Sequence, residues 1–214
     1  MERSDQALFY VGTYSPEGEE AIFLCALDLA GGEMRVLHGT KGIENPSYLA
    51  VNEACSILYA VSEKEDGEIH AFSIEPETKA LTPLGSRITD GGAPCYVSIS
   101  PREDYLFVSN YSGGNINVFP VDSGGLLQEM SSQVRHTGKG IRDDRQEAPH
   151  PHSINPDSSG ERVWVCDLGL DQILLYRMEE GRLITHSEVN LPPGSGPRHL
   201  ALHPTGGAIY SRKR

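Results

Sequence analysis

Short apolar segments separated by polar turns recur along the whole chain and predict β-strands. Apolar and polar positions alternate within segments such as 115–118 (NINV), and β-branched and aromatic residues are common in segments such as 57–61 (ILYAV). A two-residue period is typical of strands, and the glycine, asparagine and aspartate residues between the segments are typical of turns. No stretch has a sustained period of 3.6 residues, so the sequence predicts an all-β protein.

A proline opens four of these segments, and the four marker prolines define a repeat. They are 48, 57 and 46 residues apart, and a second strand ends sixteen residues after each: Pro46, Pro94, Pro151 and Pro197. A third strand is expected from Ile69, Ile116 and Ile173, and a fourth near Leu81, Leu126 and Leu183. Four strands in about 45–50 residues is the spacing of propeller blades. The sequence therefore predicts a β-propeller of four-stranded blades.

The repeat predicts one propeller domain over residues 1–214, and this domain is incomplete. Blades are expected at about 7–40, 46–90, 94–135 and 149–192, with part of a fifth at 197–214. The first copy begins at its second strand and the last stops after its second, which leaves an unclosed sheet edge. Because unpaired edges are templates for pairing, self-association through this edge is expected.

Composition and charge exclude several classes of partner. The chain has 18 Lys and Arg against 30 Asp and Glu, a formal net charge of −12. Nucleic acids and anionic membranes are bound mainly through clustered Lys and Arg, so neither is an expected partner. The first residues lack the apolar segment of a secretory signal, and no run approaches the length of a membrane span. The four cysteines are widely spaced, so we expect reduced thiols and a cytoplasmic location.

The residue after each marker proline is the first candidate for chemistry. It is Ser47, Cys95, His152 and Arg198 in successive copies. Because a repeat places equivalent positions side by side, His152 and Arg198 are expected to be neighbours. An imidazole can act as a base near neutral pH, and a guanidinium offers a rigid fork of donors to an anion. The alternative is that both side chains only satisfy loop carbonyls at the mouth of a channel.

Two further histidine positions and one carboxylate are weaker candidates for binding substrate. His150 and His152 form an H-x-H pair that could supply two zinc ligands, and His199 lies in a looser version of the same pattern. Spacing marks no third or fourth ligand, so no metal is expected. Glu63 follows the second strand of its copy and either faces the channel mouth or lies in a surface turn.

Arg145 is a candidate for contact with an anion. It belongs to the loop 136–146, whose extra length makes the third interval 57 residues. Long loops on a rigid scaffold often carry binding residues, but a solvated loop is an equally good interpretation. The Gly-Ser-Gly string at 194–196 favours a tight turn over a phosphate-binding loop.

Several longer motifs resemble those of the lactonase family of seven-bladed propellers. They are VGTYS (11–15), NPSYLAV, VSNYSGGNINVFP (108–120), DRQEAPHPHS (144–153), DLGLDQI (167–173) and PGSGPRHLALHP (193–204). The family contains the propeller-type 6-phosphogluconolactonases and the fungal carboxymuconate-lactonizing enzymes. The resemblance covers essentially the whole chain but only about four and a half of seven blades, so it predicts a chain that stops early. It implies an enzyme without a cofactor.

The resemblance also implies a site and an activity. The resemblance implies a histidine before a short strand, an arginine in the GPR string of the next blade, and a glutamate that ends the second strand of that blade. His152 and Arg198 match the first two, whereas Arg214 stands at the glutamate position. The activity implied is hydrolysis of a small anionic sugar lactone, 6-phosphoglucono-1,5-lactone, in the pentose phosphate pathway. His152 would be the general base and Arg198 the electrostatic clamp. A muconate-type lactonizing enzyme and a truncated, non-catalytic scaffold remain alternatives.

Overall fold

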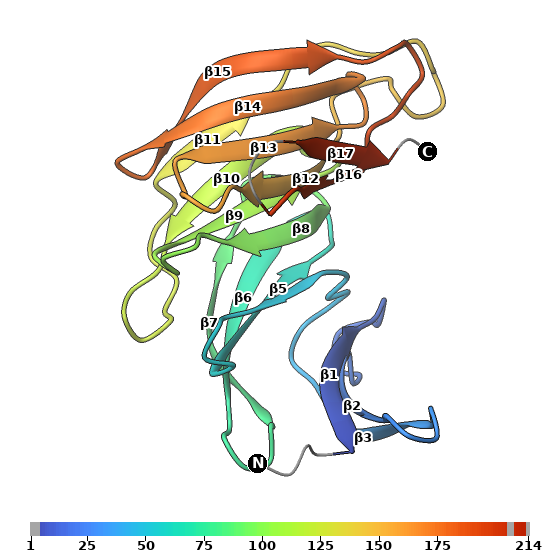
Figure 1. Ribbon diagram of the computed structural model, residues 1–214, viewed down its shortest axis with the longest axis vertical. Coiled ribbons are helices and arrows are strands. Elements are labelled where there is room, and N and C mark those ends of the chain that lie inside the picture. The colour runs from blue at the N-terminus through green and yellow to red at the C-terminus, as the bar shows by residue number, and fades with distance from the viewer. Residues whose placement is uncertain (1–4, 205–207, 213–214) are drawn as a thin grey trace.

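A computed structural model describes residues 5–204 and 208–212, and its regular elements in these ranges are all β-strands. Figure 1 shows the strands grouped into separate sheets that follow one another along the chain. The innermost strands contact one another in chain order: β4 (Leu49–Val51), β8 (Pro94–Ile99), β12 (Pro151–Pro156) and β16 (His199–Leu202). Every pair of neighbouring strands is antiparallel and consecutive in sequence. The prediction of an all-β fold with four-stranded units is confirmed for the described residues. None of the elements in these residues is a helix long and apolar enough to cross a membrane.

The sheets are named here in chain order. The first contains β1 (Gln6–Gly12), β2 (Ile22–Asp28) and β3 (Met34–Thr40). The second contains β4 (Leu49–Val51), β5 (Ile57–Ser62), β6 (Glu68–Ile74) and β7 (Leu81–Ile88). The third contains β8 (Pro94–Ile99), β9 (Tyr105–Asn110), β10 (Asn115–Pro120) and β11 (Ser132–Arg135). The fourth contains β12 (Pro151–Pro156), β13 (Arg162–Asp167), β14 (Gln172–Glu179) and β15 (Arg182–Asn190), and the fifth β16 (His199–Leu202) and β17 (Ile209–Arg212).

Hydrophobic cores lie between neighbouring sheets and use both faces of central strands such as β5 and β9. On β5, Ile57, Tyr59 and Val61 belong to the core shared with the third sheet, whereas Leu58 and Ala60 belong to the core shared with the first. Successive side chains of a strand point to opposite faces, so one strand supplies two cores. All six residues of β5 are buried for this reason.

The central strand of the third sheet repeats this division. Leu106 and Val108 on β9 pack toward the second sheet, and Phe107 packs toward Ile154 and Tyr176 of the fourth. Each sheet is therefore stabilised by burial against its neighbours, since an antiparallel sheet cannot bury both of its faces alone.

The fourth strand of the third sheet begins at Ser132, so the prediction that it begins near Leu126 is wrong. The Asp122 carboxylate accepts hydrogen bonds from the backbone N–H groups of Gly124 and Leu126, both at 2.9 Å, and closes a turn there. Leu127 is buried but pairs with Val121 only through an isolated bridge. The ladder to β10 resumes at β11, because a side-chain carboxylate that binds nearby backbone donors competes with strand pairing.

A β-bulge lies at His152, next to the third marker proline. Pro151 pairs with Asp167 and Ser153 pairs with Cys166, so His152 is an extra residue without a partner in the ladder. A bulge bends the strand and redirects a side chain, and bulges are frequent beside active sites.

The third sheet has the same irregularity at the equivalent position. The register of β8 shifts between Pro94 and Tyr96, which leaves Cys95 as the extra residue. Two successive blades therefore use the residue after the marker proline in the same way.

Candidate functional site

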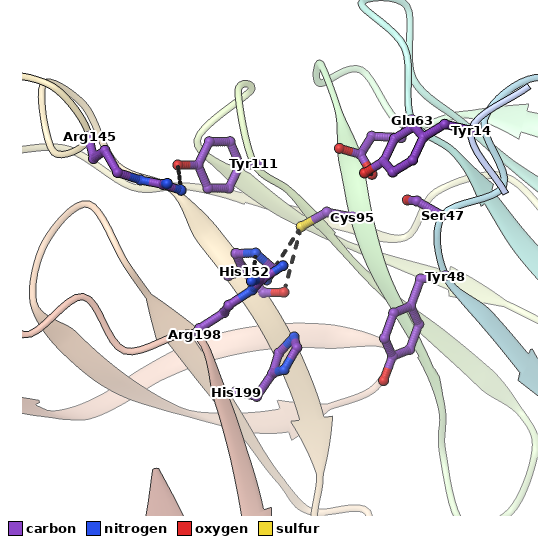
Figure 2. Close-up of a pocket in the computed structure, with 10 residues that line it drawn as sticks. All are labelled: Tyr14, Ser47, Tyr48, Glu63, Cys95, Tyr111, Arg145, His152, Arg198 and His199. Carbon is purple, nitrogen blue, oxygen red and sulfur yellow. Dashed lines mark hydrogen bonds between the residues drawn. The ribbon is translucent and has the colours of Figure 1, made fainter. Parts of the chain in front are cut away.

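A cavity of about 290 Å³ lies where the segments that follow the marker prolines meet (Figure 2). Its lining comprises Tyr14, Ser47, Tyr48, Glu63, Cys95, Tyr111, Arg145, His152, Arg198 and His199. All four residues that follow a marker proline are among them. The repeat thus brings together, in one cavity, side chains that are far apart in the sequence.

His152 and Arg198 are in direct contact, as the repeat predicts. Arg198 Nε donates a hydrogen bond to His152 Nε2 at 2.9 Å, and Nδ1 of the same ring lies 4.0 Å from the Cys95 sulfur. A guanidinium has no acceptor, so Nε2 must offer its lone pair and the ring is neutral. Burial, reinforced by the charge of Arg198, lowers the pKa of His152 to about 4.

This arrangement predicts a specific dependence of stability on pH. Between the ordinary histidine pKa of 6.5 and the folded value of about 4, the unfolded chain binds a proton at His152 that the folded chain does not. Lowering the pH through this window should therefore reduce the free energy of unfolding, by up to about 1.4 kcal/mol per pH unit for this group. Denaturant unfolding at pH 7, 6 and 5 measures it. A His152→Gln variant lacks the titrating ring, so an unchanged pH dependence in that variant would contradict the prediction.

Arg198 is available to a ligand as well as to His152. Its side chain is exposed, and within the described ranges no carboxylate lies within 4.0 Å of it. His199, the next residue, also lines the cavity, and its ring meets the His152 ring edge-on at 5.1 Å between centroids. Partial burial and the charge of Arg198 lower the pKa of His199, so the neutral form of this ring is favoured too.

An acidic wall faces this basic wall. Glu63 lines the cavity, and Tyr14 Oη donates a hydrogen bond to its Oε2 at 2.8 Å. Burial and this hydrogen bond raise the pKa of Tyr14. Figure 2 shows the Glu63–Tyr14 pair on the other side of Cys95 from His152 and Arg198. Of the two interpretations of Glu63, the channel-facing one agrees with this position.

Arg145 reaches the cavity, whereas His150 lies behind its wall. Arg145 Nη2 donates to Tyr111 Oη at 3.4 Å. The His150 ring stacks on Tyr111 with 4.2 Å between centroids, and its Nδ1 lies 2.9 Å from the Tyr111 carbonyl oxygen. Its Nε2 lies 3.1 Å from a Glu147 oxygen. His150 is thus a support for Tyr111 and is not part of the cavity lining.

The H-x-H pair does not form a two-ligand face. The bulge at His152 breaks the alternation that would place the two rings side by side, and both ring nitrogens of His150 have partners already. Across residues 5–204 and 208–212, no group of three or more His, Cys, Asp or Glu side chains is placed to hold a metal ion.

Three other expectations concern the turn at 194–196, the cysteines and the end of the chain. The tight turn at 194–196 is confirmed, because the N–H groups of Gly194 and Gly196 bind the Asp171 carboxylate at 2.6 and 2.7 Å. Cys25, Cys95 and Cys166 are buried, Cys55 is exposed, and all four are free thiols. Arg214, the residue at the glutamate position, lies outside the described residues.

Sequence reasoning missed three tyrosines that line the cavity: Tyr14, Tyr48 and Tyr111. Two of them carry a usable signal, since Thr-Tyr-Ser at 13–15 and Asn-Tyr-Ser at 110–112 both follow a second strand of the repeat. A tyrosine just after the end of a strand is no longer paired in the ladder, so its side chain can turn toward the cavity.

Fold and site together define a β-propeller protein with a polar cavity, basic on one side and acidic on the other, where its innermost strands meet. The chain belongs to the lactonase family of seven-bladed β-propellers, whose sequence model matches residues 8–213. It is 36% identical over 203 residues to the 6-phosphogluconolactonase of Bacillus subtilis. That alignment covers 94% of this chain and 58% of the relative, so the chain spans less than two thirds of the relative's length.

Solved structures agree with this family. A Bacteroides fragilis protein described as a candidate 6-phosphogluconolactonase has a TM-score of 0.91 at 29% identity. The match covers 100% of this chain and 62% of that protein. A periplasmic gluconolactonase from Pseudomonas aeruginosa has a TM-score of 0.90 at 29% identity, with coverage of 97% of this chain and 61% of that protein. The prediction of a propeller of the lactonase type is confirmed.

Proposed function

We propose that the cavity hydrolyses a sugar lactone, with 6-phosphoglucono-1,5-lactone as the substrate. The observation that carries the proposal is the contact of a neutral His152 with an exposed Arg198 in a cavity of about 290 Å³. The names of the B. subtilis and P. aeruginosa relatives support a lactone as the substrate class. A place in the pentose phosphate pathway and in the cytoplasm belongs to the same proposal.

The reaction needs a base for water and positive charge at the lactone carbonyl. In the proposed mechanism, the carbonyl oxygen of the bound lactone takes hydrogen bonds from the Arg198 guanidinium. This frees Nε2 of His152, which accepts a proton as water adds to the carbonyl carbon. The tetrahedral intermediate then breaks its bond to the ring oxygen, which leaves as a hydroxyl after taking the proton from His152. The product is an open-chain sugar acid.

The other polar side chains of the cavity match the hydrogen-bonding groups of a sugar ring. Glu63 and the tyrosine hydroxyls can bind ring hydroxyl groups, because carboxylates accept and phenols both donate and accept. His199, beside His152, narrows the space around the carbonyl in this proposal. These contacts would orient the ring without taking part in the proton transfers.

A pH profile of lactone hydrolysis tests this proposal. The base must be unprotonated, so kcat/KM should stay nearly level from pH 7 to about 5 and fall as the pH passes below about 4, the pKa of His152. His152→Ala should lose about 10²–10⁴-fold in kcat. The assay follows acid release from 6-phosphoglucono-1,5-lactone and glucono-1,5-lactone. No hydrolysis of either lactone, or a His152→Ala variant with the full rate, would reject the proposal.

A further inference from the structure

We propose that Arg145 and Tyr111 form a subsite for the phosphate monoester of the substrate, held in place by His150. This inference rests on the proposed lactone hydrolysis and deepens it, because it assigns the residues that would recognise the phosphate and so make the site prefer a phosphorylated sugar. The names of the relatives leave this choice open, since one is a 6-phosphogluconolactonase and another a gluconolactonase.

Arg145 is the loop arginine whose charge is free for a ligand. Arg142, three residues earlier, is bound by both oxygens of Asp144, at 3.2 and 3.0 Å. In the part of the chain that the structure describes, no carboxylate lies within 4.0 Å of Arg145, which lines the cavity and is only partly exposed. A planar guanidinium in this state is well suited to two oxygens of a phosphate.

Tyr111 supplies a second donor at the same point. Its hydroxyl oxygen accepts a hydrogen bond from Arg145 Nη2 at 3.4 Å, so its own O–H proton remains to be donated. The arrangement gives a phosphate two kinds of donor, one charged and one neutral, from side chains already in contact.

His150 explains why Tyr111 is rigid enough to serve. Its ring lies parallel to the Tyr111 ring, with 7° between the planes, and it also bonds the Tyr111 carbonyl oxygen. The His152 ring also meets the Tyr111 ring edge-on, with 5.7 Å between the ring centroids. A donor group held by packing before the ligand arrives costs less ordering entropy on binding.

The charges of the cavity set the direction in which a phosphorylated lactone binds. Figure 2 shows Arg145 and Tyr111 on one side of His152, and Glu63 with Tyr14 across the cavity. A phosphate dianion is repelled by the Glu63 carboxylate and attracted by Arg145, whereas the lactone carbonyl meets Arg198. The phosphate end and the reacting end of one molecule are thereby separated.

The test is the affinity of the full chain for two sugar acids, 6-phosphogluconate and gluconate, measured by isothermal titration calorimetry. Charge-assisted hydrogen bonds predict that 6-phosphogluconate binds about 10–100-fold more tightly. Arg145→Gln should bring the two affinities within about twofold, mainly by weakening the binding of 6-phosphogluconate, and Tyr111→Phe should lose part of the preference. Arg142→Gln, on the same loop, is the matched control and should keep the preference. A thermal melt checks that each variant is folded.

Several outcomes would overturn the subsite. They are equal binding of the two acids by the unmodified chain, a preference that survives in Arg145→Gln, or tighter binding of muconate than of 6-phosphogluconate. Failure of the subsite is distinguishable from failure of the proposed function. Hydrolysis of lactones without any preference for phosphate rejects the subsite alone, whereas a phosphate preference without hydrolysis of either lactone rejects the proposed function.

Discussion

Arg198→Ala is expected to lower kcat for lactone hydrolysis by about 10²–10³-fold, the usual loss when one donor to a developing oxyanion is removed. In the proposed mechanism, negative charge appears on the carbonyl oxygen as water adds, and Arg198 carries the exposed guanidinium that contacts His152. The same substitution removes a positive charge that lowers the pKa of His152, so the acid limb of the pH profile should move to higher pH. Steady-state kinetics over a range of pH measures both effects.

One variant separates the charge of Arg198 from its shape, and a second serves as a control. Arg198→Lys keeps the charge but not the planar fork, so it should recover only part of the rate. Arg102→Ala removes an exposed arginine that pairs with Asp104 away from the cavity, and it should leave kcat unchanged. The role assigned to Arg198 is wrong if its alanine variant keeps kcat within twofold of the unmodified chain.

Asp167→Ala is expected to reduce the free energy of unfolding by about 3–5 kcal/mol, as expected when one partner of a buried charged group is removed. The carboxylate is fully buried, and its Oδ2 lies 2.6 Å from Nδ1 of His136. Its Oδ1 accepts hydrogen bonds from the backbone N–H groups of His150 and Leu170, at 2.9 and 3.0 Å. Tyr176 Oη lies 2.9 Å from Nε2 of His136 and completes the network. Removing the carboxylate leaves two buried donors and one partly buried donor without a partner.

An exposed aspartate provides the control. Asp122 also accepts two backbone hydrogen bonds, but water can replace it, so Asp122→Ala should cost only about 0.5–1.5 kcal/mol. Denaturant unfolding of the two variants under identical conditions gives the comparison. A similar loss for both would mean that burial of Asp167 does not determine its contribution.

The marker prolines predicted much of the fold and the centre of the site. Their spacing gave the blades, and the equivalence of positions after the prolines placed His152 next to Arg198, which the structure confirms. The reason is physical: a repeated unit packs against its copy in a constant way, so a position in sequence becomes a position in space. The family match follows the same units along residues 8–213.

What the sequence did not predict depends on local geometry. Strand alternation predicted that His150 and His152 share a face, but His152 is itself the extra residue of a bulge at the start of β12, and the alternation fails there. The third sheet's fourth strand was displaced by the hydrogen bonds of one carboxylate, Asp122. Arg145 was a candidate from its loop, but its contact with Tyr111 depends on how that loop folds back. A regular pattern in the sequence does not indicate where the strand pairing becomes irregular.

At the bulges of Cys95 and His152, the backbone pairing that stabilises the fold does not depend on the side chain that lines the cavity. A residue left out of the ladder contributes its side chain to the cavity, while the registers on either side of it stay fixed by their own pairs. Such a position can exchange thiol for imidazole without shifting a neighbouring strand. The paired strands stay the same while the side chain at the bulge differs between blades, so a substitution at such a position can change the chemistry of the cavity without changing the fold.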